Sequence, residues 1–148
     1  MQVKEYMTTR LVTVEMDDTL DTVREIFDNT GFHHLLVVER GAVVGVLSDR
    51  DLLRHLSPYV GTLSETARDV ATLQKPVHLV MTRKPITLAP AAEFSEVLEK
   101  FAQKDVTCLP VVDDHNRLVG IVTWRDMLKV MGTILAPSNE AEEPGPAA

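Results

Sequence analysis

The sequence lacks the residues and patterns that mark several large classes of protein. Its 148 residues include one cysteine, Cys108, which excludes an internal disulfide framework and favours a reducing compartment. That cysteine lies in an apolar run, so we expect a buried, unreactive thiol. No apolar stretch has the length of a membrane span, and the first residues show no signal-peptide pattern. We therefore expect a cytoplasmic protein without a membrane partner.

Positive charge is also scarce. The chain has 15 Lys and Arg residues against 22 Asp and Glu residues, which gives a formal net charge of -7 at pH 7. Binding along a nucleic-acid backbone requires clustered Lys and Arg, so we expect no nucleic-acid partner. A small anionic ligand stays compatible with this balance, because it needs only a local cluster of donors.

Motifs of catalysis and of metal binding are missing as well. There is no Gly-x-x-x-x-Gly-Lys-Ser/Thr loop and no nucleophile elbow. Only His33 and His34 are adjacent histidines, and neighbours on a strand point to opposite faces, which makes them a poor metal site. A packed or surface role is the simpler interpretation of this pair, and donation to a phosphate is the alternative. We expect no catalytic residue and no metal.

What the sequence does contain is an internal repeat. Residues 3–8 return as residues 77–82, and residues 45–51 return as residues 120–126. Chains built from two copies of one unit usually stack the copies and act at the seam between them. One copy of about 60 residues buries too little apolar surface to be comfortably stable alone, so we expect the two copies to pack together.

Both copies predict the order strand, helix, strand, strand, helix. The first copy has these elements at about residues 11–14, 19–30, 35–38, 43–47 and 48–56. The second copy has them at about residues 86–88, 94–104, 108–112, 118–122 and 123–134. The paired strands are apolar on both faces, so they should be covered on both sides. The predicted fold class is therefore α/β of the α+β kind, with two βαββα repeats.

The predicted boundaries follow from the repeat. Residues 1–57 form repeat 1 and residues 75–134 form repeat 2. Residues 58–74 form a linker that is partly helical. Residues 135–148 are rich in Ala, Pro and Glu, and we expect them to be disordered.

The most informative motif lies twice at the junction of a strand with a helix, as Ser48 to Asp51 and as Thr123 to Asp126. A hydroxyl followed three residues later by a carboxylate forms a capping box, which is a structural role. The same junction offers amide donors and a helix dipole to a phosphate, and a carboxylate to ribose hydroxyls. Gly45 and Gly120 would let a neighbouring group approach the backbone. The residues alone leave both interpretations open.

Taken together, the order of elements, the opening Val-x-x-x-Met-Thr and the Gly-apolar-apolar-Ser/Thr-x-x-Asp junction resemble a tandem pair of CBS domains, called a Bateman module. Residues 31–38 and 106–113 are also similar to the central strand motif of that family. The resemblance covers about residues 1–57 and 75–132. It implies two repeats packed sheet to sheet with approximate twofold symmetry, in a freestanding module of the bacterial type.

The resemblance further implies a regulatory, non-enzymatic module whose clefts bind AMP, ADP, ATP or S-adenosylmethionine and which needs no cofactor. Asp51 and Asp126 would bind ribose, and Ser48 and Thr123 would bind at the ribose-phosphate side. The base would contact apolar positions: Leu11, Val12, Val46, Pro85, Ile86 and Ile121. Candidate phosphate contacts, each equally a solvated surface charge, are Arg10, Arg50, Arg83, Lys84 and Arg125.

We rank the second-copy site above the first. It keeps the prolines of the family pattern, and we group its junction with Lys84, Pro85 and Ile86. The first copy has Asp49, which would repel a polyphosphate if it points inward. The second copy has Trp124 at that position, which either stacks on a base or packs.

Partners remain general at this point. We expect a homodimer formed through apolar faces of the closing helices, and an effector protein that the sequence does not identify. The residues proposed for the dimer contact are Leu52, Leu53, Leu56, Met127, Leu128 and Met131. The alternative functions are an interaction module without a nucleotide site, and an enzyme acting on nucleotides.

Overall fold

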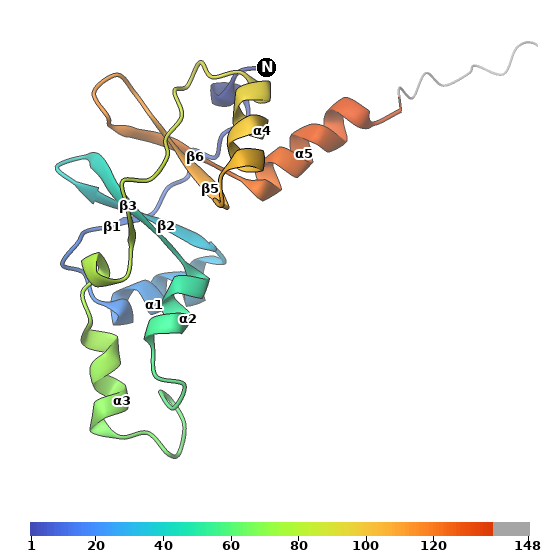
Figure 1. The fold of residues 1–148 in the computed structure, drawn as a ribbon. Helices are drawn as coiled ribbons and strands as arrows, with labels where there is room; N and C mark the ends of the chain where they lie inside the picture. Colours follow the sequence, from blue (N-terminus) through green and yellow to red (C-terminus); the bar gives the residue numbers. More distant parts are fainter. Residues whose placement is uncertain (138–148) are drawn as a thin grey trace, which may run out of the picture.

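The computed structural model describes residues 1–137 and contains two small sheets that face each other, with helices on the outer side of each (Figure 1). The first repeat contains β1 (Thr13–Val14), α1 (Leu20–Thr30), β2 (His34–Glu39), β3 (Ala42–Ser48) and α2 (Asp49–His55). The second contains α4 (Phe94–Gln103), β5 (Cys108–Val112), β6 (Leu118–Thr123) and α5 (Trp124–Leu135). The predicted α+β class with two repeats packed sheet to sheet is confirmed.

Local signals account for the boundaries of several elements. The side chain of Thr19 accepts a hydrogen bond from the amide of Thr22, and Gly31 ends α1 in the left-handed conformation, with φ of 69°. Arg40 and Gly41 both have positive φ, 51° and 80°, at the two-residue turn between β2 and β3. A turn of this kind matches the twist of a hairpin, which explains the tight connection.

The strand expected at residues 86–88 is not present as a strand. Only Leu88 pairs with the sheet, in a parallel bridge to Val111. The amide of Leu88 donates to the carbonyl of Pro110 at 2.8 Å, and the amide of Val112 donates to Leu88 at 2.9 Å. A single bonded residue is too short to count as a strand, although it occupies the place that β1 has beside β2 in the first repeat.

The opening segment of each copy pairs with the other copy. The short strand β4 (Thr82–Arg83) pairs antiparallel with β3, where Thr82 lies opposite Val46. At the equivalent place in the other repeat, Thr8 and Ile121 exchange backbone hydrogen bonds of 2.9 and 3.0 Å. This exchange was not predicted from the sequence, because the paired residues lie 36 to 113 positions apart in the chain.

The exchange extends into the two hydrophobic cores. Val77 and Met81 from the second copy are buried with Leu20, Leu35 and Leu47 of the first copy. Reciprocally, Val3 is buried in the cluster of the second copy, and Tyr6 and Met7 pack against that cluster. Each core is therefore completed by chain from the other copy, so the sequence repeat and the packing unit are not the same stretch of chain. The domain boundaries given above stay a prediction.

Two glycines explain why the exchange fits. A Cβ at Gly120 would lie 2.5 Å from Sδ of Met7, and a Cβ at Gly45 would lie 2.5 Å from Sδ of Met81. The carbonyl of Thr8 would also lie 3.2 Å from a Cβ at Gly120. The Met-Thr and Gly-x-x-Ser/Thr motifs are therefore two halves of one contact, formed between copies.

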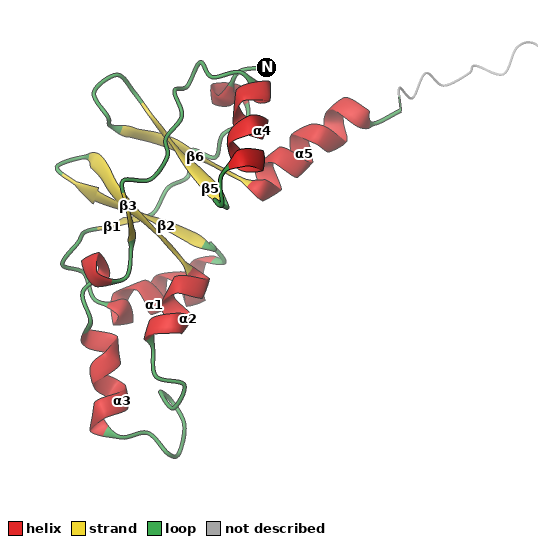
Figure 2. Ribbon diagram, in the orientation of Figure 1, coloured by secondary structure: helices red, strands yellow, loops and turns green. Residues whose placement is uncertain are grey.

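A third apolar cluster joins the two sheets across the seam. It contains the buried side chains of Leu36, Cys108 and Ile121, against which Leu11 and Val46 pack. Figure 2 shows the two sheets meeting at the centre of the molecule, with α1 and α2 on one outer side and α4 and α5 on the other. Each strand pair thus faces helices on one side and the other repeat on the opposite side, which explains its apolar character on both faces.

The structure agrees with the expectation of a partly helical linker, but it agrees only in part with the expectation for the closing helices. A short helix, α3 (Ala67–Ala71), forms in the linker and projects from the body (Figure 1). Leu52 and Met127, expected in a dimer contact, are only 5% and 1% exposed because they belong to the cores of their own repeats, so that expectation is wrong for both. Leu53 and Leu128 are exposed, at 72% and 63%.

Two further expectations concern regions at the margins. The predicted disordered tail lies mostly outside the described residues, since residues 138–148 are not described. Within residues 1–137, no helix combines the length and apolar character needed to cross a bilayer.

We expect Gly120→Ala to destabilise the protein by about 1–3 kcal/mol, because the new methyl group must displace Met7 and the opening segment. Gly132→Ala in α5 is the matched control. Nothing lies within 4 Å of a Cβ at Gly132, so this change should stabilise the helix by about 0.5–1 kcal/mol. Urea unfolding of both variants measures the difference. Equal stability of the two variants would contradict the interlocking role of Gly120.

Candidate functional site

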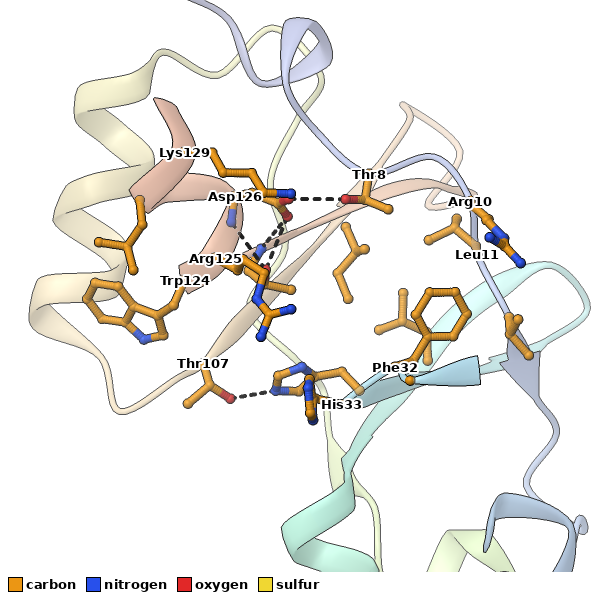
Figure 3. Close-up of a pocket in the computed structure, with 17 residues that line it drawn as sticks. Thr8, Arg10, Leu11, Phe32, His33, Thr107, Trp124, Arg125, Asp126 and Lys129 are labelled. Atoms are coloured by element: carbon orange, nitrogen blue, oxygen red, sulfur yellow. Dashed lines mark hydrogen bonds between the residues drawn. The ribbon is translucent and has the colours of Figure 1, made fainter. Parts of the chain in front are cut away.

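A cavity of about 520 Å³ opens between the two repeats, at the junction of β6 with α5 (Figure 3). Its lining residues come from three segments, residues 8–12, 31–36 and 121–129, and Thr107 also lines it. Seven of the residues predicted to bind ligand line it: Arg10, Leu11, Val12, Ile121, Thr123, Arg125 and Asp126. The other eight do not line it: Val46, Ser48, Arg50, Asp51, Arg83, Lys84, Pro85 and Ile86.

The cavity combines residues of both copies. The expected grouping of the second-copy junction with Lys84, Pro85 and Ile86 is wrong, because none of the three lines the cavity. The exchange of opening segments places residues 8–12 of the first copy beside Ile121 instead. A site at each junction must therefore be assembled from one copy's junction and the other copy's opening segment.

Asp126 is fixed by three hydrogen bonds at the rim of the cavity. The amide of Thr123 donates to Oδ2 at 2.9 Å and the hydroxyl of Thr123 donates to the same oxygen at 3.2 Å. The hydroxyl of Thr8 donates to Oδ1 at 3.2 Å. In return, the amide of Asp126 donates to Oγ1 of Thr123 at 3.4 Å. The capping box is confirmed, and it holds a carboxylate with unused acceptor capacity on the cavity wall.

Positive side chains line the same cavity. Arg10, Arg125 and Lys129 line the cavity, and Asp126 is the one acidic residue in its described lining. The guanidinium of Arg10 lies 5.9 Å from the ring centroid of Phe32, and in Figure 3 the Arg125 side chain extends into the cavity. In a chain with net charge -7, the lining of this cavity is a local positive region that favours an anionic ligand.

Two histidines complete the end of the cavity near Thr107. Nε2 of His34 lies 2.8 Å from the hydroxyl of Thr107, in a hydrogen bond that crosses between the repeats. Burial lowers the pKa of His34, although the carboxylate of Asp49 acts in the opposite direction. Nδ1 of His33 lies 2.9 Å from Oδ2 of Asp49. Partial burial of Asp49 opposes the shift, but the hydrogen bonds from His33 and the amide of Arg50 lower its pKa.

An apolar wall faces these polar groups. It is formed by Leu11, Val12, Phe32, Leu36 and Ile121. Such a mixture, apolar on one side and with a few fixed polar groups on the other, is typical of small-molecule sites.

Trp124 lies at the edge of the cavity and also packs within its own repeat. Its ring centroid is 4.9 Å from that of Phe101, and 43% of the residue is exposed. The packing interpretation of Trp124 is therefore confirmed, while stacking on a base stays a prediction.

Several lining residues were missed from the sequence: Thr8, Phe32, Leu36, Thr107, Leu128 and Lys129. Two of them carried a usable signal. Thr8 belongs to the repeated Met-Thr motif, and Lys129 follows Arg125 by four residues, which places both on one helix face. Thr107 carried none, because its proximity to His34 depends on packing between copies.

The junction of the first copy differs chemically from that of the second. Ser48 and Asp51 form an equivalent capping box, with hydrogen bonds of 3.1 and 2.9 Å. The residue that corresponds to His34 in the second copy is Cys108, which is 6% exposed. Burial raises the pKa of Cys108 to about 12, and the negative charge of Asp51 adds to this effect. The two junctions are thus related by the repeat, but they present different groups.

No group of three or more His, Cys, Asp or Glu residues among residues 1–137 has an arrangement that could bind a metal ion.

Comparison with known proteins gives consistent matches over both repeats. The family model described as CBS domain matches residues 3–58 and 77–133. A CBS domain-containing protein of Dictyostelium discoideum is 32% identical over 137 residues, which cover 91% of this chain and 94% of that protein. Two uncharacterized Methanocaldococcus jannaschii proteins, 30% and 28% identical, are longer, and the chain spans 43% and 46% of their lengths.

Solved structures give similar matches. CBSX2 in complex with AMP is 26% identical, with a TM-score of 0.74, over 90% of this chain and 97% of that chain. The cytosolic domain of the Mg²⁺ channel MgtE in complex with ATP is 30% identical, with a TM-score of 0.69, over 87% of this chain and 48% of that chain. The CBS domain pair of MJ0100, with 5'-methylthioadenosine and S-adenosyl-L-methionine, is 25% identical, with a TM-score of 0.73, over 89% and 100%.

The position of Cys108 gives a direct test of how tightly the seam is closed. With a pKa of about 12, about one thiol in ten thousand is ionised at pH 8, and the thiolate is the reactive form. We expect iodoacetamide to label the native protein at least about 100-fold more slowly than the same protein in guanidinium chloride, as followed by mass spectrometry. Rapid labelling of the native protein would show instead that the seam opens frequently.

Proposed function

Because the chain belongs to the CBS domain family, we propose that it is a ligand-sensing regulatory module that binds an adenine nucleotide in the cavity between its repeats. The observation that carries this proposal is the composition of the cavity. An apolar wall, a fixed carboxylate and three cationic side chains line one space of about 520 Å³. Those are the groups that a base, a ribose and a phosphate require.

Each part of the ligand has a matching group. The carboxylate of Asp126 accepts hydrogen bonds from the ribose hydroxyls, since its oxygens retain lone pairs beyond those used by Thr8 and Thr123. The adenine ring lies against Leu11 and Ile121 and their apolar neighbours. Arg125 and the other cations of the cavity bind the phosphate oxygens, for which the guanidinium fork is well suited.

The charge of the cavity favours a nucleotide over S-adenosylmethionine. Three cationic side chains face one carboxylate in the described lining. S-adenosylmethionine carries a positive sulfonium centre, which this wall repels, whereas AMP, ADP and ATP carry negative phosphates. The similar structures of CBSX2 with AMP and of MgtE with ATP support the nucleotide, and that of MJ0100 makes the adenosyl alternative worth testing.

The regulatory output follows from where the ligand lies. Its binding groups come from both repeats, so an occupied cavity favours one relative position of the repeats. Binding shifts such an equilibrium only by its difference in affinity for the two states. We propose that this shift changes the contact with an effector protein or with a second copy of the chain, through an exposed surface that includes Leu53 and Leu128. The module itself performs no chemistry.

Isothermal titration calorimetry with AMP, ATP, S-adenosylmethionine and adenosine tests the proposal. We expect AMP or ATP to bind more tightly than S-adenosylmethionine. No heat with any of the four at millimolar concentration would support an interaction module without a ligand site, in which Ser48 and Thr123 are only helix caps. Conversion of ATP or AMP during the titration, which we do not expect, would support an enzyme.

The role of Asp126 is tested with Asp126→Asn, since Asn keeps an oxygen for the capping box whereas Ala would remove it. We expect about tenfold weaker AMP binding, the effect of losing one charged hydrogen bond of about 1.4 kcal/mol. Asp51→Asn is the matched control, because Asp51 forms the same box but does not line the cavity. Chemical denaturation checks that both variants fold. Normal binding by Asp126→Asn would show that the carboxylate does not contact the ribose.

A further inference from the structure

The two histidines of the cavity differ in what their protonation would change. His33 is 2.9 Å from the carboxylate of Asp49, so a protonated His33 forms an ion pair with no net charge. His34 is 2.8 Å from the hydroxyl of Thr107, a neutral group. Protonation of His34 therefore adds positive charge to the cavity wall, in a side chain whose ordinary pKa lies near neutrality.

The charged groups around His34 act in both directions. Asp49 and Asp51, from α2, favour the protonated ring, and His33, the residue just before β2, opposes it. From the other walls of the cavity, Asp126 adds a negative charge, and three cations add positive charges: Arg10, Arg125 and Lys129. Burial is the largest effect and lowers the pKa of His34, so it favours the neutral ring.

We propose that His34 is a binding residue for a phosphate of the ligand, and that affinity for phosphate-bearing ligands therefore rises as the pH falls. This inference rests on the proposed function and adds a residue and a pH dependence to it. A phosphate bound at this end of the cavity supplies a negative charge that stabilises the protonated ring of the partly buried His34. Figure 3 shows Thr107 and His33 at one end of the cavity, with the Arg125 side chain extending toward that end.

The hydrogen bond between His34 and Thr107 fits this role. A protonated imidazole donates from both nitrogens. Nε2 then donates to the Thr107 hydroxyl, and Nδ1 is left to donate to the ligand. The hydroxyl of Thr107, which accepts from the ring, keeps its own proton for a phosphate oxygen. Protonation of one ring thus provides two donors to the same anion.

The sign of the pH dependence follows from linkage. A phosphate raises the pKa of His34 on binding, so the complex takes up a proton. Above the pKa of the complex, His34 stays neutral and contributes no charge. The affinity for a phosphate-bearing ligand then rises as the pH falls from the pKa of His34 in the complex to the lower pKa of His34 in the protein without ligand. Each tenfold gain in affinity at the acid end corresponds to a pKa raised by about one unit.

The experiment compares wild-type protein with His34→Gln at pH 8, 7 and 6, using AMP and adenosine as probes in calorimetry. The phosphate of AMP itself gains a proton near pH 6, so the measured quantity is the ratio of wild-type to variant affinity at each pH. For AMP we expect a ratio near one at pH 8 and at least about threefold at pH 6. For adenosine the ratio should not change with pH. His115→Gln is the matched control, because His115 is exposed and does not line the cavity, and it should behave as wild type.

Three outcomes would overturn the inference. A constant ratio for AMP would show that His34 does not bind the phosphate. The same pH dependence with adenosine would show that His34 acts on the cavity in general. Binding of S-adenosylmethionine without binding of AMP would overturn this inference and the choice of nucleotide, but would leave the sensing module standing.

A second measurement needs no variant. In an NMR titration of the imidazole signals of wild-type protein, the pKa of His34 should rise when AMP is present and should not change when adenosine is present. If His34→Gln does not fold, this titration decides the question, and an unchanged pKa with AMP would overturn the inference.

Discussion

The contact between each copy's opening segment and the other copy's sheet is the constraint on which the rest of the structure depends. It consists of a few backbone hydrogen bonds, such as those between Thr8 and Ile121, and of methionine side chains seated over glycines. Without it, neither apolar core is complete, because Val3 and Val77 each belong to the core of the opposite copy. It also places residues 8–12 beside the start of α5, and so creates the cavity.

Much of the fold could be predicted because its signals are local. A capping hydroxyl, a terminal glycine and a two-residue turn each act within a few positions of the chain, as at Thr19, Gly31 and Gly41. The exchange between copies could not be predicted in the same way. The residues near Thr82 do not indicate whether Thr82 pairs with β3 or with β6, because the pairing depends on how the two sheets pack against each other. For the same reason the residues of the cavity were grouped with the wrong partners.

The helix faces show a similar limit. The periodicity of apolar residues predicts which face of a helix is buried, but it does not predict how wide the buried face is. Leu52 and Leu53 are neighbours on α2, yet the first is 5% exposed and the second 72%. At the junctions, by contrast, the two competing interpretations of the Ser/Thr and Asp motif turned out to be compatible. The hydrogen bonds of the capping box hold the Asp126 carboxylate in place at the wall of the cavity. A structural role for a residue is therefore no argument against a binding role at the same residue.

The linker that carries α3 projects from the body, while the segments on either side of it are interwoven (Figure 1). A break of the peptide chain near residue 62 would leave two fragments, and each would contribute an opening segment to the hydrophobic core of the other. The fragments would remain a noncovalent complex in which the cavity is intact, since its walls already come from both sides of the break. The two copies are in this sense arranged like two subunits that are covalently joined, and the linker raises their effective concentration.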